Sequence, residues 1–318
     1  MGYKGKSRAN PPQRHPKRKR AASTSSSDSD DRISVNGAAS NASDVDVEFT
    51  FHDLSESDFH GVSLLVQRLI PDVFDFTSLT EAIVEQQNIG VKIVTDESDG
   101  GVCAFGTLLN LRQYYSSVSG FASLIHYIKK NSPLDTLPYL DPSVGSTGLF
   151  LGERLINIPP ALGPQMHGVL VEDAVWSLTP EAACPPDEVA FYNFQHVLVF
   201  SSFLLDPAEA AGPAAGPVAG PAAGPVAGPA AGPAAGPAKK KKKKVARREA
   251  AAAERGNRIY THAEDEVLVE AAVREWTWPA GEHDDGDKIY KKHRLCYVLQ
   301  WSVYVEQVSR LVQALSSS

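Results

Sequence analysis

The feature that most limits what this chain can fold into is a run of seven Gly-Pro tetrads over 210–237, which six consecutive lysines closely follow. A proline in every fourth position prevents a helix from propagating, and the intervening alanines, valines and glycines are too small to build a core. We therefore predict that residues 207–256 form an extended linker. Because apolar segments stand on both sides, we expect this linker to be an insertion in a surface loop of one domain, which loop-closure entropy tolerates.

A second biased segment lies at the start of the chain. Residues 1–44 are rich in Ser, Asp, Lys and Arg and contain no aromatic residue after Tyr3. Such a segment cannot bury enough apolar area to offset its chain entropy, so we predict a disordered tail. The remaining residues, 45–206 and 257–318, are enough for a single domain with one hydrophobic core.

The net charge of -7 conceals a strongly acidic body. Residues 1–22 and 239–255 together hold 17 of the 31 basic side chains, which leaves 14 basic against 36 acidic side chains elsewhere, a formal charge near -22. A body with this charge repels nucleic-acid phosphates and attracts cationic proteins. Solubility alone is the alternative explanation.

The sequence contains no stretch approaching 18 consecutive apolar residues, and its basic N-terminus is not followed by an apolar run. We therefore expect a soluble, intracellular protein with neither a membrane span nor a secretory signal. Three widely spaced cysteines, an odd number, are typical of reduced thiols rather than a disulfide framework: Cys103, Cys184 and Cys296.

Two dense cationic clusters are typical of nuclear localisation signals, which import receptors recognise on flexible segments. A solvated charged tail is the alternative for both, and the lysine run also suits a nonspecific contact with RNA phosphates. We predict a nuclear protein with an import receptor as partner, recognised through Pro16, Lys17, Arg18, Lys19, Arg20, Lys239, Lys240, Lys241, Lys242, Lys243 and Lys244.

Hydrophobic periodicity predicts both strands and helices. Strands are expected over 45–51, 90–96, 101–111, 189–205 and 293–301, with the second and third forming a hairpin. Helices are expected over 57–70, 78–87, 119–131, 161–176 and 303–316, the first two capped by Ser57 and Ser78. The segment 263–278 is ambiguous, but its alternating valines favour a strand, and three prolines predict a loop over 133–142. The fold class is α+β, with a mixed, largely antiparallel sheet flanked by helices.

The sequence shows no established catalytic or metal-binding motif. It lacks the CxxC, HxxxH and HExxH spacings of zinc sites, a GxSxG elbow and a P-loop. The segment "HDDGD" at 283–287 lacks the ligand spacing of an EF-hand and is interpreted as a solvated turn. One glycine at a helix start, in "SVSGFA" at 117–122, is a weak candidate for an anion cradle. We therefore predict no catalytic residue, cofactor or metal.

The stretch "LFLGERLINIPPALG" joins an apolar strand to a charged pair and a double proline. Glu153 and Arg154 are adjacent in sequence and do not face each other, so they are not expected to form a mutual ion pair. We expect Arg154 to bind carbonyl groups at the strand end and Asn157 to cap the next helix, while Pro159 and Pro160 set its direction. The motif is thus predicted to be architectural rather than catalytic.

Several motifs in the same order resemble the BCCIP family of eukaryotic nuclear proteins. They are "DVEFTFHDLSESDFHGVSLLVQRL", "LTEAIVEQQNIGVKIVTD", "FGTLLNL", "GLFLGERLINIPPALGPQMHGVL" and "FYNFQHVLVF" followed by a basic linker. The resemblance covers residues 45–206 and, more loosely, 257–318.

The resemblance implies a fold similar to that of the GCN5-related N-acetyltransferases, without enzymatic activity. It implies a nuclear binding protein or chaperone that escorts a basic large-subunit ribosomal protein in 60S biogenesis and nuclear export, with cell-cycle and recombination proteins as further partners. The alternative is an acetyl-CoA-dependent enzyme. Acetyl-CoA-binding members of that superfamily carry Gln/Arg-x-x-Gly-x-Gly/Ala before a helix, and neither "SVSGFA" nor "QNIGVK" fits that pattern.

Overall fold

The computed structural model describes residues 33–34, 47–70, 75–86, 88–95, 101–182, 184–206 and 257–316. Nearly all of the predicted tail, both cationic clusters and the linker over 207–256 lie outside these residues, so the statements made about them stay predictions. No helix within the described ranges has the length and apolar character needed to cross a membrane.

The described strands form one nine-stranded sheet with the order β1-β2-β3-β4-β5-β6-β9-β8, and β7 also pairs with β6. From β1 to β5 each strand is antiparallel to the next, whereas β5 and β6 are parallel. The predicted mixed, largely antiparallel sheet is confirmed. The strands are β1 (Ile33–Ser34), β2 (Glu48–Asp53), β3 (Gly90–Thr95), β4 (Ala104–Asn110), β5 (Thr147–Arg154), β6 (His196–Leu205), β7 (Arg258–Tyr260), β8 (Arg274–Asp284) and β9 (Ile289–Gln300).

The chain divides into two compact units. The first comprises residues 1–201, 262–276 and 295–318 and contains every described helix. The second comprises 202–261 and 277–294, which include β7, the last residues of β6, most of β8 and the first half of β9.

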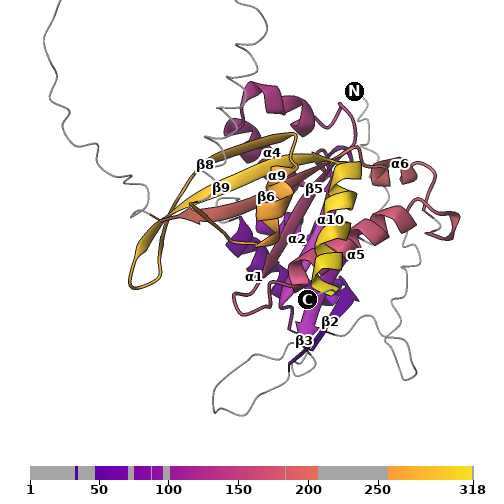
Figure 1. The fold of residues 1–318 in the computed structure, drawn as a ribbon. Helices are drawn as coiled ribbons and strands as arrows, with labels where there is room; N and C mark the ends of the chain where they lie inside the picture. Colours follow the sequence, from indigo (N-terminus) through magenta and orange to yellow (C-terminus); the bar gives the residue numbers. More distant parts are fainter. Residues whose placement is uncertain are drawn as a thin grey trace, which may run out of the picture. The chain divides into compact units, whose positions relative to one another are not determined.

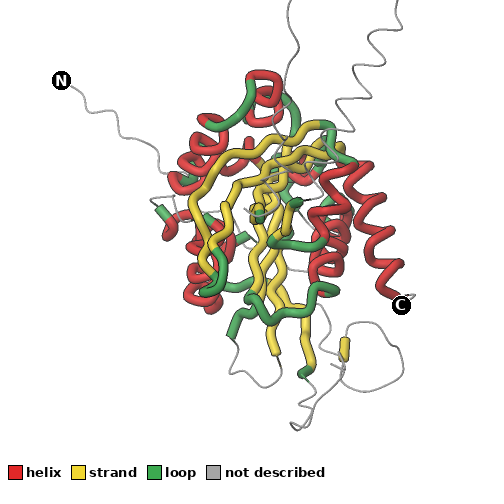
Figure 2. The backbone as a smooth tube through the Cα atoms, turned by 60° about the vertical axis from the view of Figure 1, so that its left-hand side comes forward, coloured by secondary structure: helices red, strands yellow, loops and turns green. Residues whose placement is uncertain are grey.

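In the first unit, helices cover both faces of the sheet (Figures 1 and 2). One layer contains α1 (Phe59–Leu69), α2 (Phe76–Glu85) and α4 (Ser119–Lys130), and the other contains α5 (Leu162–Trp176), α9 (Glu264–Glu270) and α10 (Trp301–Ser316). Successive side chains of β4 point to opposite faces of the sheet, so neighbouring residues contact different layers. A Cβ atom on Gly106 would lie 2.9 Å from Met166 of α5, whereas the next residue, Thr107, bonds to Gln86 at the end of α2. We call these the α1–α2–α4 layer and the α5–α9–α10 layer.

Shorter helices connect these elements. They are α3 (Leu111–Tyr114), α6 (Val189–Tyr192) and the 3₁₀ turns η1 (Glu56–Asp58), η2 (Leu134–Leu140) and η3 (Pro180–Ala182). The loop predicted over 133–142 is therefore mostly η2, and the strand predicted over 189–205 begins only at His196, after α6.

In the second unit, β7 pairs with the end of β6 and opposes Leu205 to Arg258. Asp206 and Asn257, the residues that flank 207–256, therefore directly follow and directly precede two paired strands. The guanidinium of Arg258 lies 4.5 Å from the ring centre of Phe203, and Lys288 binds Asp206. The predicted turn at 283–287 is confirmed between β8 and β9, where Gly286 has a φ of 94° that favours glycine.

The predicted capping residues of the first two long helices are wrong. Ser55 and Asp58 form a capping box on η1, with Ser55 two residues before the predicted cap, and α1 continues from it. The α2 helix begins two residues early because the carboxylate of Asp75 accepts from the backbone N–H of Ser78 at 3.1 Å. A carboxylate is a stronger acceptor than a hydroxyl group, so it takes the capping position where both are within reach.

The strand predicted over 263–278 is also wrong in its first half. Residues Glu264–Glu270 form α9, and β8 begins only at Arg274. Three acidic residues in the first turn favour a helix because they interact well with the positive end of its dipole. Leu268 and Val269 are both buried, and the alternating valines gave a misleading strand pattern.

Candidate functional site

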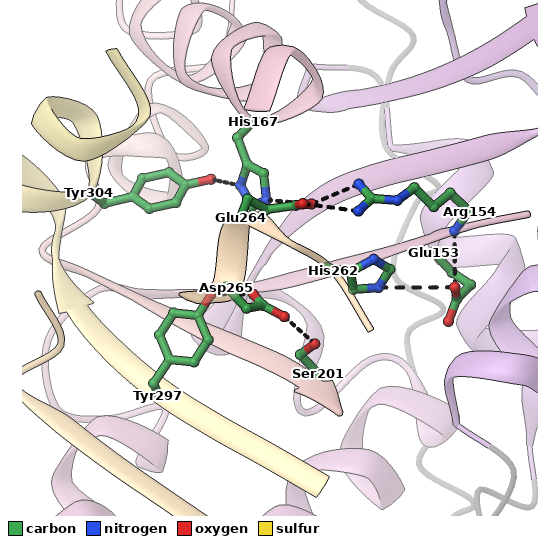
Figure 3. A network of polar contacts seen from close by, with 9 residues as sticks. All are labelled: Glu153, Arg154, His167, Ser201, His262, Glu264, Asp265, Tyr297 and Tyr304. Carbon is green, nitrogen blue, oxygen red and sulfur yellow. Dashed lines mark hydrogen bonds and ion pairs between the residues drawn. The ribbon is translucent and has the colours of Figure 1, made fainter. Parts of the chain in front are cut away.

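The site is built where two parallel strands stop pairing. The β5–β6 ladder runs from Thr147–His196 to Phe150–Val199, although both strands continue beyond it. The segment 262–265 bridges this gap, since it contacts Glu153 and Arg154 of β5 and Ser201 of β6 (Figure 3). All residues discussed for this site belong to the first unit.

A buried ion pair forms the centre of the site. The guanidinium of Arg154 donates from Nη1 and Nη2 to the two carboxylate oxygens of Glu264, at 2.9 and 3.0 Å. A Cβ atom on Gly163 would lie 2.3 Å from Nη1 and 2.4 Å from Oε1, so the pair rests directly on the first turn of α5. Burial by itself would raise the pKa of Glu264, but Arg154 and two nearby histidines outweigh it and lower that pKa.

His167 of α5 lies on one side of the ion pair. Its Nδ1 is 2.6 Å from the hydroxyl of Tyr304, its Nε2 is 3.9 Å from Glu264, and its ring stacks on Phe150 at 4.2 Å. Burial lowers the pKa of His167 to about 4, although Glu264 partly opposes the shift. The imidazole is therefore neutral near pH 7.

Asp265 holds the other side of the segment. Its carboxyl group accepts from the hydroxyls of Ser201 and Tyr297, both at 2.5 Å. Burial, with a further contribution from the charge of Glu264, raises the pKa of Asp265 to about 7 despite these bonds. The pKa values of the adjacent residues Glu264 and Asp265 are thus shifted in opposite directions, because only Glu264 has a cation beside it.

His262 completes the cluster. Its Nε2 is 4.0 Å from Glu153, whose carboxylate also accepts from the backbone N–H of Arg154 at 3.0 Å. Burial lowers the pKa of His262 to about 4. Its Nδ1 is buried and makes no hydrogen bond within the part of the chain that the structure describes.

The arrangement is suited to holding the chain together. None of the nine side chains in Figure 3 belongs to a residue more than 9% exposed, so a substrate atom reaches them only if the strand gap opens. A general acid or base must come within hydrogen-bonding distance of the reacting group. These polar groups instead fasten the segment 262–265 to β5, α5, β6 and β9, and Tyr304 of α10 joins the cluster through His167.

The residues of the motif around 153–160 have two different roles: Arg154 belongs to the buried cluster, and the two prolines lead into α5. Arg154 binds Glu264, 110 residues away, rather than the strand-end carbonyls predicted for it. Pro159 and Pro160 precede α5 as predicted, and their carbonyls accept from Leu162 and Gly163 at 3.1 Å. The capping role predicted for Asn157 is wrong, because Ala161 occupies the N-cap and no side chain caps α5. Asn157 lies four residues before the N-cap position of the helix.

Sequence reasoning missed the other members of the cluster: His167, Ser201, His262, Glu264, Asp265, Tyr297 and Tyr304. The only local signal was a polar residue inside an apolar run, as at His167, and that pattern does not identify a partner.

The structure also describes the residues considered for an anion cradle, a metal site and a disulfide. The start of α4, considered as an anion cradle, is taken by the chain itself: Ser119 donates to Asp75, and Gly120 N–H donates to Ser78 Oγ at 2.9 Å. Within the described ranges, no group of three or more His, Cys, Asp or Glu side chains is placed to hold a metal ion. The three cysteines are free thiols.

Comparison with known proteins gives consistent matches. The protein family described as BCCIP matches residues 44–268. The "Protein bcp1" of Emericella nidulans is 30% identical over 260 residues, which cover 78% of this chain and 77% of that protein. The "Protein BCCIP homolog" of Arabidopsis thaliana is 30% identical over 51% of this chain, and the match spans only 49% of the relative's own length.

Among solved structures, the crystal structure of BCP1 from Saccharomyces cerevisiae matches with a TM-score of 0.54 and 16% identity, over 86% of this chain and 91% of the yeast chain. That likeness concerns the fold alone. Arabidopsis thaliana NAA60 matches with a TM-score of 0.32, too weak to carry an argument about activity. The family match includes β5, its double-proline turn and the segment that fills the strand gap. The chain belongs to the BCCIP family.

Proposed function

We propose that this protein is a non-enzymatic nuclear binding protein that escorts a basic client, a large-subunit ribosomal protein, during 60S biogenesis and nuclear export. Membership of the BCCIP family and the acidic body support the proposal. The predicted cationic clusters over 16–20 and 239–244 supply the nuclear address.

The observation that carries the proposal is the unequal charge of the two helical layers. The helices of the α5–α9–α10 layer contain seven acidic residues and a single basic one, Arg310. The helices of the α1–α2–α4 layer contain two acidic and three basic residues. Three of the seven acids, Asp173, Glu264 and Asp265, are buried, but the four exposed acids still outnumber the single base. The exposed charge of these helices is therefore negative, which attracts a cationic protein and speeds its association.

The loop after β5 argues against the acetyl-CoA alternative. From Arg154 to Pro159 the sequence is R-L-I-N-I-P, so Asn157 and Pro159 stand where acetyl-CoA-binding proteins of the resembled superfamily have small residues. Proline has no N–H to offer to a phosphate group. The segment 262–265 also fills the strand gap beside this loop.

A binding titration tests the proposal. The purified full chain is titrated with a basic large-subunit ribosomal protein at low and high salt, with an acidic protein of similar size as control. We expect tight binding of the basic protein alone, and weaker binding at high salt because ions screen the attraction. Failure to bind at low salt would overturn the proposal.

A thermal-shift titration with acetyl-CoA tests the enzyme alternative separately. A ligand of the native state must raise the melting temperature. We expect no shift, and a concentration-dependent rise would favour the enzyme.

A further inference from the structure

The α5–α9–α10 layer exposes apolar side chains among its acids. Val175 on α5 is 52% exposed, Leu178 just after α5 is 43% exposed, and Val267 on α9 is 38% exposed. Scattered exposed valines and leucines are common on protein surfaces, so their number alone signifies little. Their position beside exposed glutamates, on helices that together contain one Lys or Arg, is the informative feature.

Helical spacing places these apolar residues beside glutamates. Glu172 precedes Val175 by three residues, and Glu270 follows Val267 by three, so each pair shares one helix face. Glu266 and Glu270 are four residues apart on α9, are both exposed, and have no Lys or Arg on their own helix. On α10, Glu306 is already bonded to Arg310 at 2.6 Å.

The opposite layer provides a natural comparison. Glu81 and Glu85 on α2 have the same four-residue spacing and are also exposed. However, no large apolar side chain of α2 itself is exposed, although Leu64 on α1 is 65% exposed. Three basic residues, Arg68, Lys129 and Lys130, also belong to this layer. The two pairs therefore match in charge and spacing but differ in their surroundings.

We infer that the client docks on the α5–α9–α10 layer through a basic segment that carries apolar side chains among its Lys and Arg residues. This inference rests on the proposed function, since it specifies where and through which chemistry the cationic client binds. Lys and Arg of the segment face Glu172, Glu266 and Glu270, while its apolar side chains cover Val175, Leu178 and Val267. RNA is excluded as the occupant by the same glutamates, which repel phosphates.

Two matched charge reversals test the docking face. The variants E266K/E270K on α9 and E81K/E85K on α2 change the net charge equally, and each is measured in the full chain against the same basic ribosomal protein. We expect the α9 variant to lose about tenfold or more in affinity, whereas the α2 variant stays within about threefold. Circular dichroism checks the fold, and the neutral variants E266Q/E270Q and E81Q/E85Q replace the reversals if either fails to fold.

The two failures can be distinguished from each other. Equal weakening by both reversals overturns the docking face but leaves a generally electrostatic client interaction in place. Absence of binding by the unmodified chain overturns the proposed function itself.

A pair of synthetic peptides tests the chemistry of the partner. Both carry the same number of lysines, one interspersed with leucines and the other with serines. The leucine peptide should bind more tightly to the unmodified chain, and V175S/V267S should remove that difference. Equal binding of both peptides would overturn the apolar part of the inference. Single-stranded RNA is tested on a full-length variant in which the cationic clusters over 16–20 and 239–244 are replaced by serines, and tighter binding of RNA than of either peptide by that variant would overturn the choice of partner.

Discussion

The two helical layers pack on the same sheet but are attached to it by different forces. The α1–α2–α4 layer is held by apolar side chains such as Leu79 and Ile83, both fully buried, with a polar link from Thr107 to Gln86 at 2.8 Å. The α5–α9–α10 layer is held in addition by the buried cluster around Arg154 and Glu264. Apolar contacts are non-directional, whereas a bidentate ion pair requires one register. The layer with the greater excess of acidic residues is therefore the one fixed by the bidentate ion pair.

This difference also separates two kinds of acid on α9. Glu264 and Asp265 point into the cluster and are buried, while Glu266 and Glu270 are exposed. One short helix thus supplies both the internal fastening and the outward charge. Substitutions at the buried acids are therefore expected to change stability most, and a change of exposed charge is expected to change it least.

The largest effect is expected from Glu264→Ala. This change leaves the buried guanidinium of Arg154 without its counter-ion, which costs about 3–5 kcal/mol of the free energy of unfolding. Urea denaturation followed by circular dichroism measures the loss. Ile83→Val in the α1–α2–α4 layer is the control, with an expected loss of about 0.5–1.5 kcal/mol. A smaller loss for the Glu264 variant than for the control would show that the ion pair does not fasten the layer.

The next effect is a change in the pH dependence of stability. The pKa of Asp265 is raised from 3.8 to about 7, so its contribution is present below pH 3.8 and is lost as pH rises toward 7. The pKa values of His167 and His262 are lowered from 6.5 to about 4, so their contributions are present above pH 6.5 and are lost as pH falls toward 4.

Between pH 4.5 and 6.5 the two histidines therefore make stability rise with pH, and Asp265 opposes that rise. Asp265→Asn removes this opposing proton. The free energy of unfolding should therefore rise more steeply with pH, and the slope should increase by about 1.4 kcal/mol per pH unit. Urea midpoints at three pH values within this window measure the slope. An unchanged slope would mean that Asp265 ionises normally in the fold.

A matched pair of glycine substitutions in α5 should differ in sign. In Gly163→Ala the new methyl group meets the ion pair at 2.3 Å, and such overpacking costs about 1–3 kcal/mol. In Gly168→Ala the methyl group would lie 3.5 Å from Val312, an ordinary contact, and alanine should stabilise the helix by about 0.5–1 kcal/mol. Thermal unfolding of both variants checks the prediction, which fails if they shift the melting temperature in the same direction.

The smallest effect on stability is expected from Arg310→Ala, which removes the only basic side chain of the α5–α9–α10 helices. Arg310 is 65% exposed, so the loss of its bond to Glu306 should change stability by no more than about 0.5 kcal/mol. The same change makes the layer more negative, so affinity for the basic client should rise. Weaker binding would indicate that Arg310 contacts the client directly.

Much of the secondary structure could be predicted because it depends on local patterns. The β3–β4 hairpin, α4 and α10 all follow from hydrophobic periodicity within a single segment. The caps at Asp75 and Asp58 and the short helix α9 were missed because a nearby carboxylate or a cluster of acids outweighed the pattern of apolar residues.

The buried cluster could not be predicted in the same way. Arg154 and Glu264 are 110 residues apart, and Asp265 and Tyr297 are 32 residues apart. No periodicity links such positions, so the sequence suggested strand-end carbonyls as the partners of Arg154. Adjacent acids with opposite pKa shifts are likewise invisible until their neighbours in space are known.

The sequence by itself determined the total charge, the two cationic clusters, the Gly-Pro segment and the strand-turn-helix motif at 147–176. These are sums over residues or patterns within one segment, and they do not depend on how distant segments meet. Only the tertiary structure decided that α5, α9 and α10 share one side of the sheet and that three of their seven acids face inward. The physical reason is that electrostatic and packing energies depend on distances in space, which folding alone establishes.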